Sequence, residues 1–248
     1  MTTPTPLPAD PHERAAALIS RFGPHPVTAL GLDLESGLEV SIDRWLIAAC
    51  LLGARLDEAS AKTAFRALEA AQIAEPTTLA KHQRVEVEAV LHRAGVRKPE
   101  RAAQLLCRVG QSLVRRFNGS VSTLGHGADD LEELGGRLAS LAPGFGRAGI
   151  VRFLRPLREL WPAALDLPLE PAARSAAIHL GWIGEGDDEL VDAERLRSIV
   201  RAGAPALCPY DLEAALGRLG HLCCVRENAA RCPLAASCPL RRRGRQRG

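Results

Sequence analysis

The stretch that decides the fold is Leu138-Ala-Ser-Leu-Ala-Pro-Gly-Phe-Gly-Arg-Ala-Gly-Ile150, where an apolar helical pattern runs into Gly-x-Gly and a second helix follows. Two glycines permit a tight turn and a close approach of the backbone to a ligand. The backbone amides at the start of the second helix have no partner inside the helix, so they can bind a phosphate group. The segment therefore predicts a helix-hairpin-helix phosphate grip, although a glycine-rich connector would have the same pattern.

On both sides of this hairpin the sequence predicts further helices. Apolar residues recur at helical spacing, and no stretch alternates with a period of two for long enough to form a sheet. We therefore expect an all-α protein, in which Pro156 kinks one of the helices. The expected helices cover residues 43–52, 57–71, 85–93, 100–117, 131–141, 147–161, 171–180, 192–202 and 209–221.

Length and composition narrow the class of protein. The 248 residues are 46% hydrophobic and 25% charged, which is typical of a globular chain with one large or two small domains. No apolar run reaches the roughly 18 residues of a membrane span, and residues 1–11 lack the pattern of a signal peptide. We expect a cytoplasmic protein without a membrane partner.

The charge is distributed unevenly. Five of the 32 basic residues are arginines in the last eight positions, 241–248, and without them the balance is 27 basic against 29 acidic residues. The body of the chain is therefore no polycation, and any nucleic-acid site must be local. The basic tail at 241–248 is expected either to hold DNA or only to aid solubility.

The cysteines also cluster. Five of the seven fall between residues 208 and 238, whereas Cys50 and Cys107 lie on apolar helical faces and are expected in the core. In a cytosolic chain such a cluster indicates metal or iron–sulfur ligation before disulfides. Four thiolates suit either a [4Fe–4S] cluster or a tetrahedral zinc ion.

The chain resembles the endonuclease III family of helix-hairpin-helix DNA glycosylases, roughly over residues 15–240. The resemblance covers six segments in the family's order. They are Pro24-His-Pro-Val-Thr-Ala-Leu30, the central helix 46–55, the loop and helix start 95–102, the hairpin 142–147, the approach 161–166 to the catalytic aspartate, and the C-terminal cysteines.

This resemblance implies two helical domains with a DNA-binding cleft between them, into which a damaged base is flipped. One domain would be a helical bundle of residues 38–160 that ends in the hairpin at 138–150. The other would combine residues 11–37 with 161–240 and carry the cluster, after a disordered tail at 1–10. The implied partner of this monomer is double-stranded DNA with a damaged or mispaired base, and the protein would be associated with the nucleoid.

The resemblance also implies DNA contacts. Arg55 occupies the place of a glutamine that fills the gap left by the flipped base, and Val96 that of a leucine wedge. The alternatives are a solvated arginine for Arg55 and a buried cap on the preceding helix for Val96. The hairpin residues implied to bind DNA are Gly144, Phe145, Gly146, Arg147 and Ala148.

The chain departs from the family pattern at the position of the family's catalytic lysine. Bifunctional members carry a lysine where this chain has Ala148, and no lysine follows Lys98. A Schiff base with the sugar is therefore excluded at this position. What the family pattern still implies is monofunctional base removal, in which a carboxylate stabilises a positively charged sugar while water attacks.

Two carboxylates compete for that role. Counting from the hairpin gives Asp166, 18 residues after Ala148, and we place it first; counting back from His179-Leu-Gly181 gives Glu170. Either residue is equally explained as a helix-capping or solvated carboxylate. Because the family's Asp-x-His pattern is absent, a catalytically weak or inactive relative that binds bent or damaged DNA is the alternative function.

The cysteine spacing matches the family's only in part. The interval from Cys232 to Cys238 equals the family's last interval, and Cys224 resembles its first ligand. The fourth ligand of the implied [4Fe–4S] cluster would be Cys223 or, one helix upstream, Cys208. Ligation by both Cys223 and Cys224 would demand an irregular backbone after Gly220.

Overall fold

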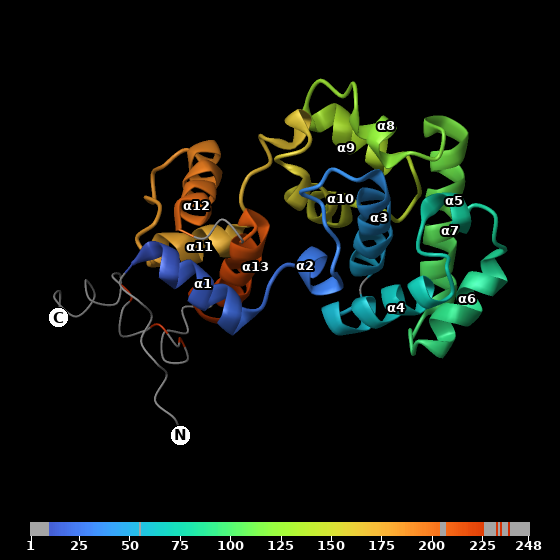
Figure 1. The fold of residues 1–248 in the computed structure, drawn as a ribbon, viewed down its shortest axis with the longest axis horizontal. Coiled ribbons are helices and arrows are strands. Elements are labelled where there is room, and N and C mark those ends of the chain that lie inside the picture. Colours follow the sequence, from blue (N-terminus) through green and yellow to red (C-terminus); the bar gives the residue numbers. More distant parts are fainter. Residues whose placement is uncertain are drawn as a thin grey trace. The chain divides into compact units, whose positions relative to one another are not determined.

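The structure is a computed structural model, and it describes residues 10–54, 56–203, 207–225, 232, 234 and 238. That part of the chain is helical and contains no strand, which confirms the all-α prediction (Figure 1). None of its helices combines the length and apolar character that crossing a membrane requires. The chain divides into two compact units: residues 26–167, here called the hairpin unit, and residues 1–25 with 168–248, here called the thiol unit.

The hairpin unit is built around a central apolar helix, α3, as the sequence predicts. Every residue of α3 from Trp45 to Leu51 is buried. The indole Nε1 of Trp45 donates a hydrogen bond of 2.9 Å to the carbonyl of Phe153. The helices of this unit are α2 (Pro26–Leu30), α3 (Glu39–Gly53), α4 (Glu58–Ala70), α5 (Pro76–Leu79), α6 (Arg84–Arg93), α7 (Pro99–Phe117), α8 (Val121–Gly125), α9 (Leu131–Ala139) and α10 (Arg147–Leu154).

A pair of glycines lets α10 lie close against α3. A Cβ atom built on Gly53 would lie 3.3 Å from the Cα of Gly149, so the two backbones meet without side chains between them. The guanidinium of Arg152 adds a 2.8 Å hydrogen bond to the carbonyl of Leu52. The end of α3 is thereby fixed beside the helix that follows the hairpin.

Pro156 ends the helix that it was expected to kink. The α-helix stops at Leu154, and a 3₁₀ turn covers Arg155–Leu157. Proline has no amide hydrogen and its ring clashes with the preceding turn, so a kink and a helix end are both common outcomes. A second 3₁₀ turn at Pro162–Ala164 completes the unit.

The unit boundaries differ from those expected from the sequence. The divisions fall at 25/26 and 167/168 rather than at 37/38 and 160/161. At the first boundary, Arg66 of α4 donates a 2.6 Å hydrogen bond to the carbonyl of Leu30, which ties α2 to the hairpin unit. At the second, the ring of Trp161 stacks edge-on against Phe153, with centroids 5.7 Å apart.

The thiol unit joins the two ends of the chain. Its elements are α1 (Pro11–Phe22), α11 (Pro171–His179), α12 (Glu189–Gly203), α13 (Pro209–Leu219) and a π-helical turn, Gly220–Cys224. Apolar side chains of all four helices form one core, which includes Leu18, Ala176, Leu196 and Leu216. Residues far apart in sequence thus depend on each other for burial.

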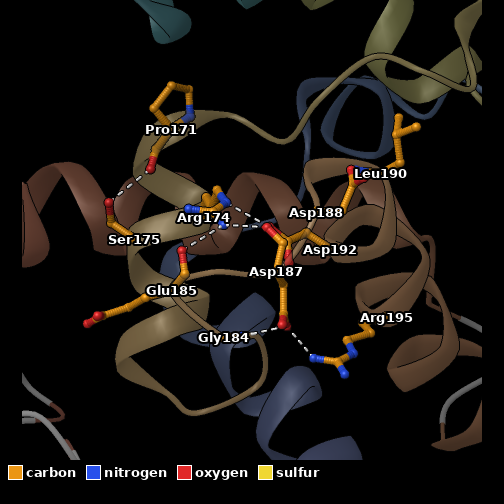
Figure 2. A network of polar contacts seen from close by, with 10 residues as sticks. All are labelled: Pro171, Arg174, Ser175, Gly184, Glu185, Asp187, Asp188, Leu190, Asp192 and Arg195. Carbon is orange, nitrogen blue, oxygen red and sulfur yellow. Dashed lines mark hydrogen bonds and ion pairs between the residues drawn. The ribbon is translucent and has the colours of Figure 1, made fainter.

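A buried ion pair connects α11 to α12 in this unit (Figure 2). The Nε of Arg174 lies 2.7 Å from Oδ2 of Asp192, whose side chain is fully buried. The same guanidinium donates a 3.1 Å hydrogen bond to the carbonyl of Asp187. Arg174 therefore organises the loop that joins the two helices.

Candidate DNA-binding and catalytic site

The predicted hairpin is a tight turn between α9 and α10. Gly144 adopts φ +103°, a backbone conformation that residues with a Cβ atom rarely adopt. Phe145 is buried, and its ring lies 3.1 Å from the position of a Cβ atom on Gly149. The phenylalanine thus holds the turn from the core side, while Gly144 and Gly146 are exposed.

Backbone amides at the start of α10 are available to a ligand. Gly146 is the N-cap residue, and its carbonyl accepts hydrogen bonds from the amides of Gly149 (2.9 Å) and Ile150 (3.1 Å). The amides of Arg147 and Ala148 have no acceptor among the described residues. Together with the positive end of the helix dipole, these two amides form a site suited to a phosphate oxygen.

The other predicted DNA contacts of the hairpin unit differ in their placement. Arg55 lies outside the described residues, directly after the residue that caps α3. Val96 is 4% exposed, and its amide donates a 3.1 Å hydrogen bond to Leu91 after the left-handed Gly95. Val96 therefore closes α6 as a buried cap, and a wedge role stays a prediction that requires this loop to open.

The two candidate carboxylates have different surroundings. Asp166 is exposed on the last turn of the hairpin unit, and no described residue forms a hydrogen bond or an ion pair with it. Glu170 lies in the thiol unit at the N-cap position of α11, but its side chain accepts no capping hydrogen bond. Of the two residues, only Glu170 forms hydrogen bonds with other described side chains, which lie in α13 and the turn after it.

Three contacts hold Glu170 against α13 and the π-helical turn. Its Oε1 lies 2.8 Å from Nε2 of His221, and its Oε2 lies only 2.6 Å from where a Cβ atom on Gly217 would be. Its backbone amide donates a 3.0 Å hydrogen bond to the buried carboxylate of Glu213. The sequence did not point to His221, because its contact with Glu170 joins residues 51 positions apart.

The adjacent cysteines lie in the irregular backbone that their ligation would demand. The π-helical turn Gly220–Cys224 brings Cys223 into the core and leaves Cys224 half-buried. A Cβ atom on Gly220 would lie 1.9 Å from the carbonyl oxygen of Ala172, so only glycine fits where this turn meets α11.

Four thiols gather at this turn. Burial, followed by the charge of Cys232 and a hydrogen bond with it, raises the pKa of Cys223 to about 11. Burial also raises the pKa of Cys224 to about 12, with added repulsion from the thiolates of Cys232, Cys223 and Cys238. The sulfur of Cys238 lies 3.8 Å from the carbonyl oxygen of His179.

This donor set fits a soft metal in its chemistry. Within the described residues no three His, Cys, Asp or Glu side chains stand at ligating geometry, so the thiols are gathered but not arranged around an ion. Cys208 begins α13, whose 11 residues separate it from the turn by about 16 Å, so Cys223 is the better fourth donor. Cys50 and Cys107 are buried core residues, as predicted.

Comparison with known proteins gives this chain no function. No protein-family model matches the chain, and no curated protein is significantly similar to it in sequence.

Proposed function

We propose that this protein is a DNA glycosylase that removes a damaged or mispaired base from double-stranded DNA by monofunctional hydrolysis. The observation that carries the proposal is the hairpin turn, where a left-handed Gly144 and the unpaired amides of Arg147 and Ala148 offer a site for a backbone phosphate. Such a grip positions a duplex without reading its sequence. It suits an enzyme that must hold many different sites.

The reaction needs an anion beside the sugar. In the proposed mechanism the target nucleotide leaves the base stack, because a stacked base is out of reach. A carboxylate then stabilises the positive charge that develops on the sugar as the base departs, and water completes the hydrolysis. We assign this role to Glu170 ahead of Asp166, because His221 contacts its carboxylate and its backbone amide is bonded to Glu213 of α13, whereas no described residue forms a hydrogen bond or an ion pair with the carboxylate of Asp166.

The product would keep its DNA strand intact. Ala148, exposed in the first turn of α10, has no amine with which to attack the sugar. The enzyme would therefore release a base and leave an abasic site.

The thiols of the second unit would hold a [4Fe–4S] cluster. Cys223, Cys224, Cys232 and Cys238 are the proposed ligands, because the first two share the irregular π-helical turn and the last two have the spacing that the family resemblance implies. The cluster would supply a covalent centre around which the C-terminal segment folds. No step of base removal is assigned to it.

Base release can be tested directly. End-labelled duplexes that carry a panel of damaged and mispaired bases are incubated with the protein and then divided, with and without hot alkali. Strand breaks that appear only after alkali support the proposal. Glu170→Gln should abolish them while duplex binding persists, whereas absence of breaks on every lesion contradicts the enzymatic function.

A second candidate is a DNA-binding relative without catalysis. The observation that favours it is that His221 already contacts Oε1 of Glu170, while Oε2 lies against the backbone at Gly217. A protein of this kind would bind bent or damaged duplex more tightly than intact duplex and release no base. The same panel distinguishes the two functions when binding is measured alongside strand breaks.

A further inference from the structure

One face of α7 carries a row of long polar side chains. Arg101, Gln104, Arg108, Gln111 and Arg115 are all exposed, and they recur at the three- and four-residue spacing of one helical face. The residues on the opposite side, from Ala102 to Leu113, are buried in the hairpin unit. We call these five residues the α7 stripe.

The arginines of the stripe have no acidic partner. Arg101, Arg108 and Arg115 form no ion pair with any described residue, and Glu100 is the single acidic residue of α7. Five basic residues elsewhere in the same unit are paired with glutamates. These pairs are Arg44–Glu69, Lys62–Glu58, Arg66–Glu69, Arg84–Glu88 and Arg137–Glu133, at 2.7 to 3.3 Å.

Further unpaired cations extend the stripe at its N-terminal end. Arg97 and Lys98, in the loop before α7, are exposed and have no acidic partner among the described residues. Positive charge is therefore concentrated along one helix and its leading loop, although the chain as a whole is nearly neutral. A row of exposed cations that no described carboxylate neutralises is the charge arrangement that a binding surface for an anionic polymer needs.

The stripe adjoins the hairpin. A Cβ atom on Gly144 would lie 4.0 Å from Cδ1 of Leu105, which lies between stripe residues Gln104 and Arg108. The hairpin turn thus lies beside the part of α7 that carries Gln104 and Arg108. Along the helix the three arginines lie about 10.5 Å apart and span about 21 Å, the length of roughly six base pairs.

We propose that the α7 stripe binds the sugar-phosphate backbone of duplex DNA beyond the nucleotide held by the hairpin. This inference rests on the proposed DNA-binding function and extends it. Arginine guanidinium groups donate paired hydrogen bonds to phosphate, and the intervening glutamines donate to phosphate or sugar oxygens. Because the contacts are to the backbone, they add affinity without sequence preference.

The test is the salt dependence of binding to an undamaged fluorescent duplex of about 20 base pairs. The variant Arg101→Gln/Arg108→Gln/Arg115→Gln removes three charges and preserves helix propensity. The control Lys62→Gln/Arg84→Gln/Arg195→Gln removes three charges that are paired with carboxylates. Thermal unfolding of both variants establishes that they are folded.

We expect the stripe variant to bind roughly 100-fold more weakly at 0.1 M salt, and its slope of log affinity against log salt to flatten by up to about 2.7. The control should keep the slope of the unmodified protein. Equal slopes for the stripe and control variants would refute DNA binding by the α7 stripe but leave the proposed phosphate site of the hairpin intact. Failure of the unmodified protein to bind duplex overturns both, and a stripe variant that loses only heparin binding overturns DNA as the occupant.

Discussion

The Nε2 atom of His221 lies 2.8 Å from Oε1 of Glu170, so the π-helical turn after α13 is tied to the first residue before α11. His221 stands two residues before Cys223, in the turn that gathers the thiols. The π-helical turn therefore contacts the candidate catalytic carboxylate through His221 and also carries two of the candidate cluster ligands, Cys223 and Cys224. A change in the backbone of this turn should therefore move the carboxylate of Glu170.

This contact predicts that His221 positions Glu170. His221→Ala should slow base release by up to about 100-fold, because a carboxylate displaced by about 1 Å loses that much rate. His221→Gln retains a side-chain donor and should recover most of it. The effect should fall on kcat and not on KM, measured under multiple-turnover conditions. Equal rates for the alanine and glutamine variants would refute the positioning role.

The hairpin glycine gives a prediction about both stability and binding. Gly144→Ala places a Cβ atom on a backbone with φ +103°, which costs about 1–3 kcal/mol, and the distorted turn should bind duplex more weakly. Gly135→Ala in α9 is the matched control, because its Cβ atom would meet nothing within 4 Å. The free energy of unfolding of that control, measured by urea denaturation, should rise by about 0.5–1 kcal/mol. A stabilised Gly144→Ala would contradict the assigned turn geometry.

The four thiols predict a coloured protein. The purified chain should be yellow-brown with about four irons, and replacing Cys224, Cys232 or Cys238 by serine should bleach it. Cys223→Ser should bleach it too, whereas Cys208→Ser should not. Cys107→Ser, in the core of the hairpin unit, is the control that keeps the colour. A colourless protein with one zinc per chain would exclude iron–sulfur but keep the four-thiolate site.

Asp43 should make the hairpin unit sensitive to pH. Burial, with smaller contributions from nearby Glu39 and Glu75 and against the opposing hydrogen bond from the amide of Val121, raises the pKa of its carboxyl to about 7. Since the unfolded pKa is 3.8, the folded state binds the proton more tightly, and stability should fall as pH rises from about 4 to 7. Asp43→Asn should remove this dependence and add on the order of 1 kcal/mol at pH 8. Melting curves between pH 4 and 8 would test it, and parallel curves for both proteins would count against it.

The buried pair of Arg174 and Asp192 predicts a large loss of stability. Arg174→Ala leaves the fully buried carboxylate of Asp192 without its partner, which should cost about 3–5 kcal/mol. The control is Arg195→Ala, which breaks an exposed contact with Asp187 and should cost less than about 1 kcal/mol. Chemical denaturation measures both, and similar losses for the two variants would show that the buried pair is unimportant.

Local pattern was enough to predict much of the helical architecture. The apolar run around Trp45 predicted the central helix, and the glycines at 144 and 146 predicted a tight turn between two helices, because both depend on neighbours in sequence. The short helices α2, α5 and α8 were not foreseen, since each has too few residues for a periodic pattern to appear. The unit boundary at 25/26 was also missed, because the contact of Leu30 with Arg66 spans 36 residues.

The candidate site was predictable in its residue types but not in its contacts. The cysteine spacing identified the four thiols, and the adjacency of Cys223 and Cys224 required the irregular turn that is observed. Counting along the sequence left both Asp166 and Glu170 as candidates, and it could not show that only Glu170 contacts α13 and the turn after it within the described residues. That contact joins residues 170 and 221, and sequence patterns carry no information about it.

The discontinuous thiol unit has a consequence for synthesis. On the ribosome, every residue of the hairpin unit has been made once Leu167 is added, so that unit can fold while translation continues. Helix α1 emerges first but buries Leu18 against helices near the other end of the chain, the last of which begins at Pro209. During synthesis the apolar face of α1 therefore stays uncovered until α11, α12 and α13 have been made, long after the hairpin unit can fold.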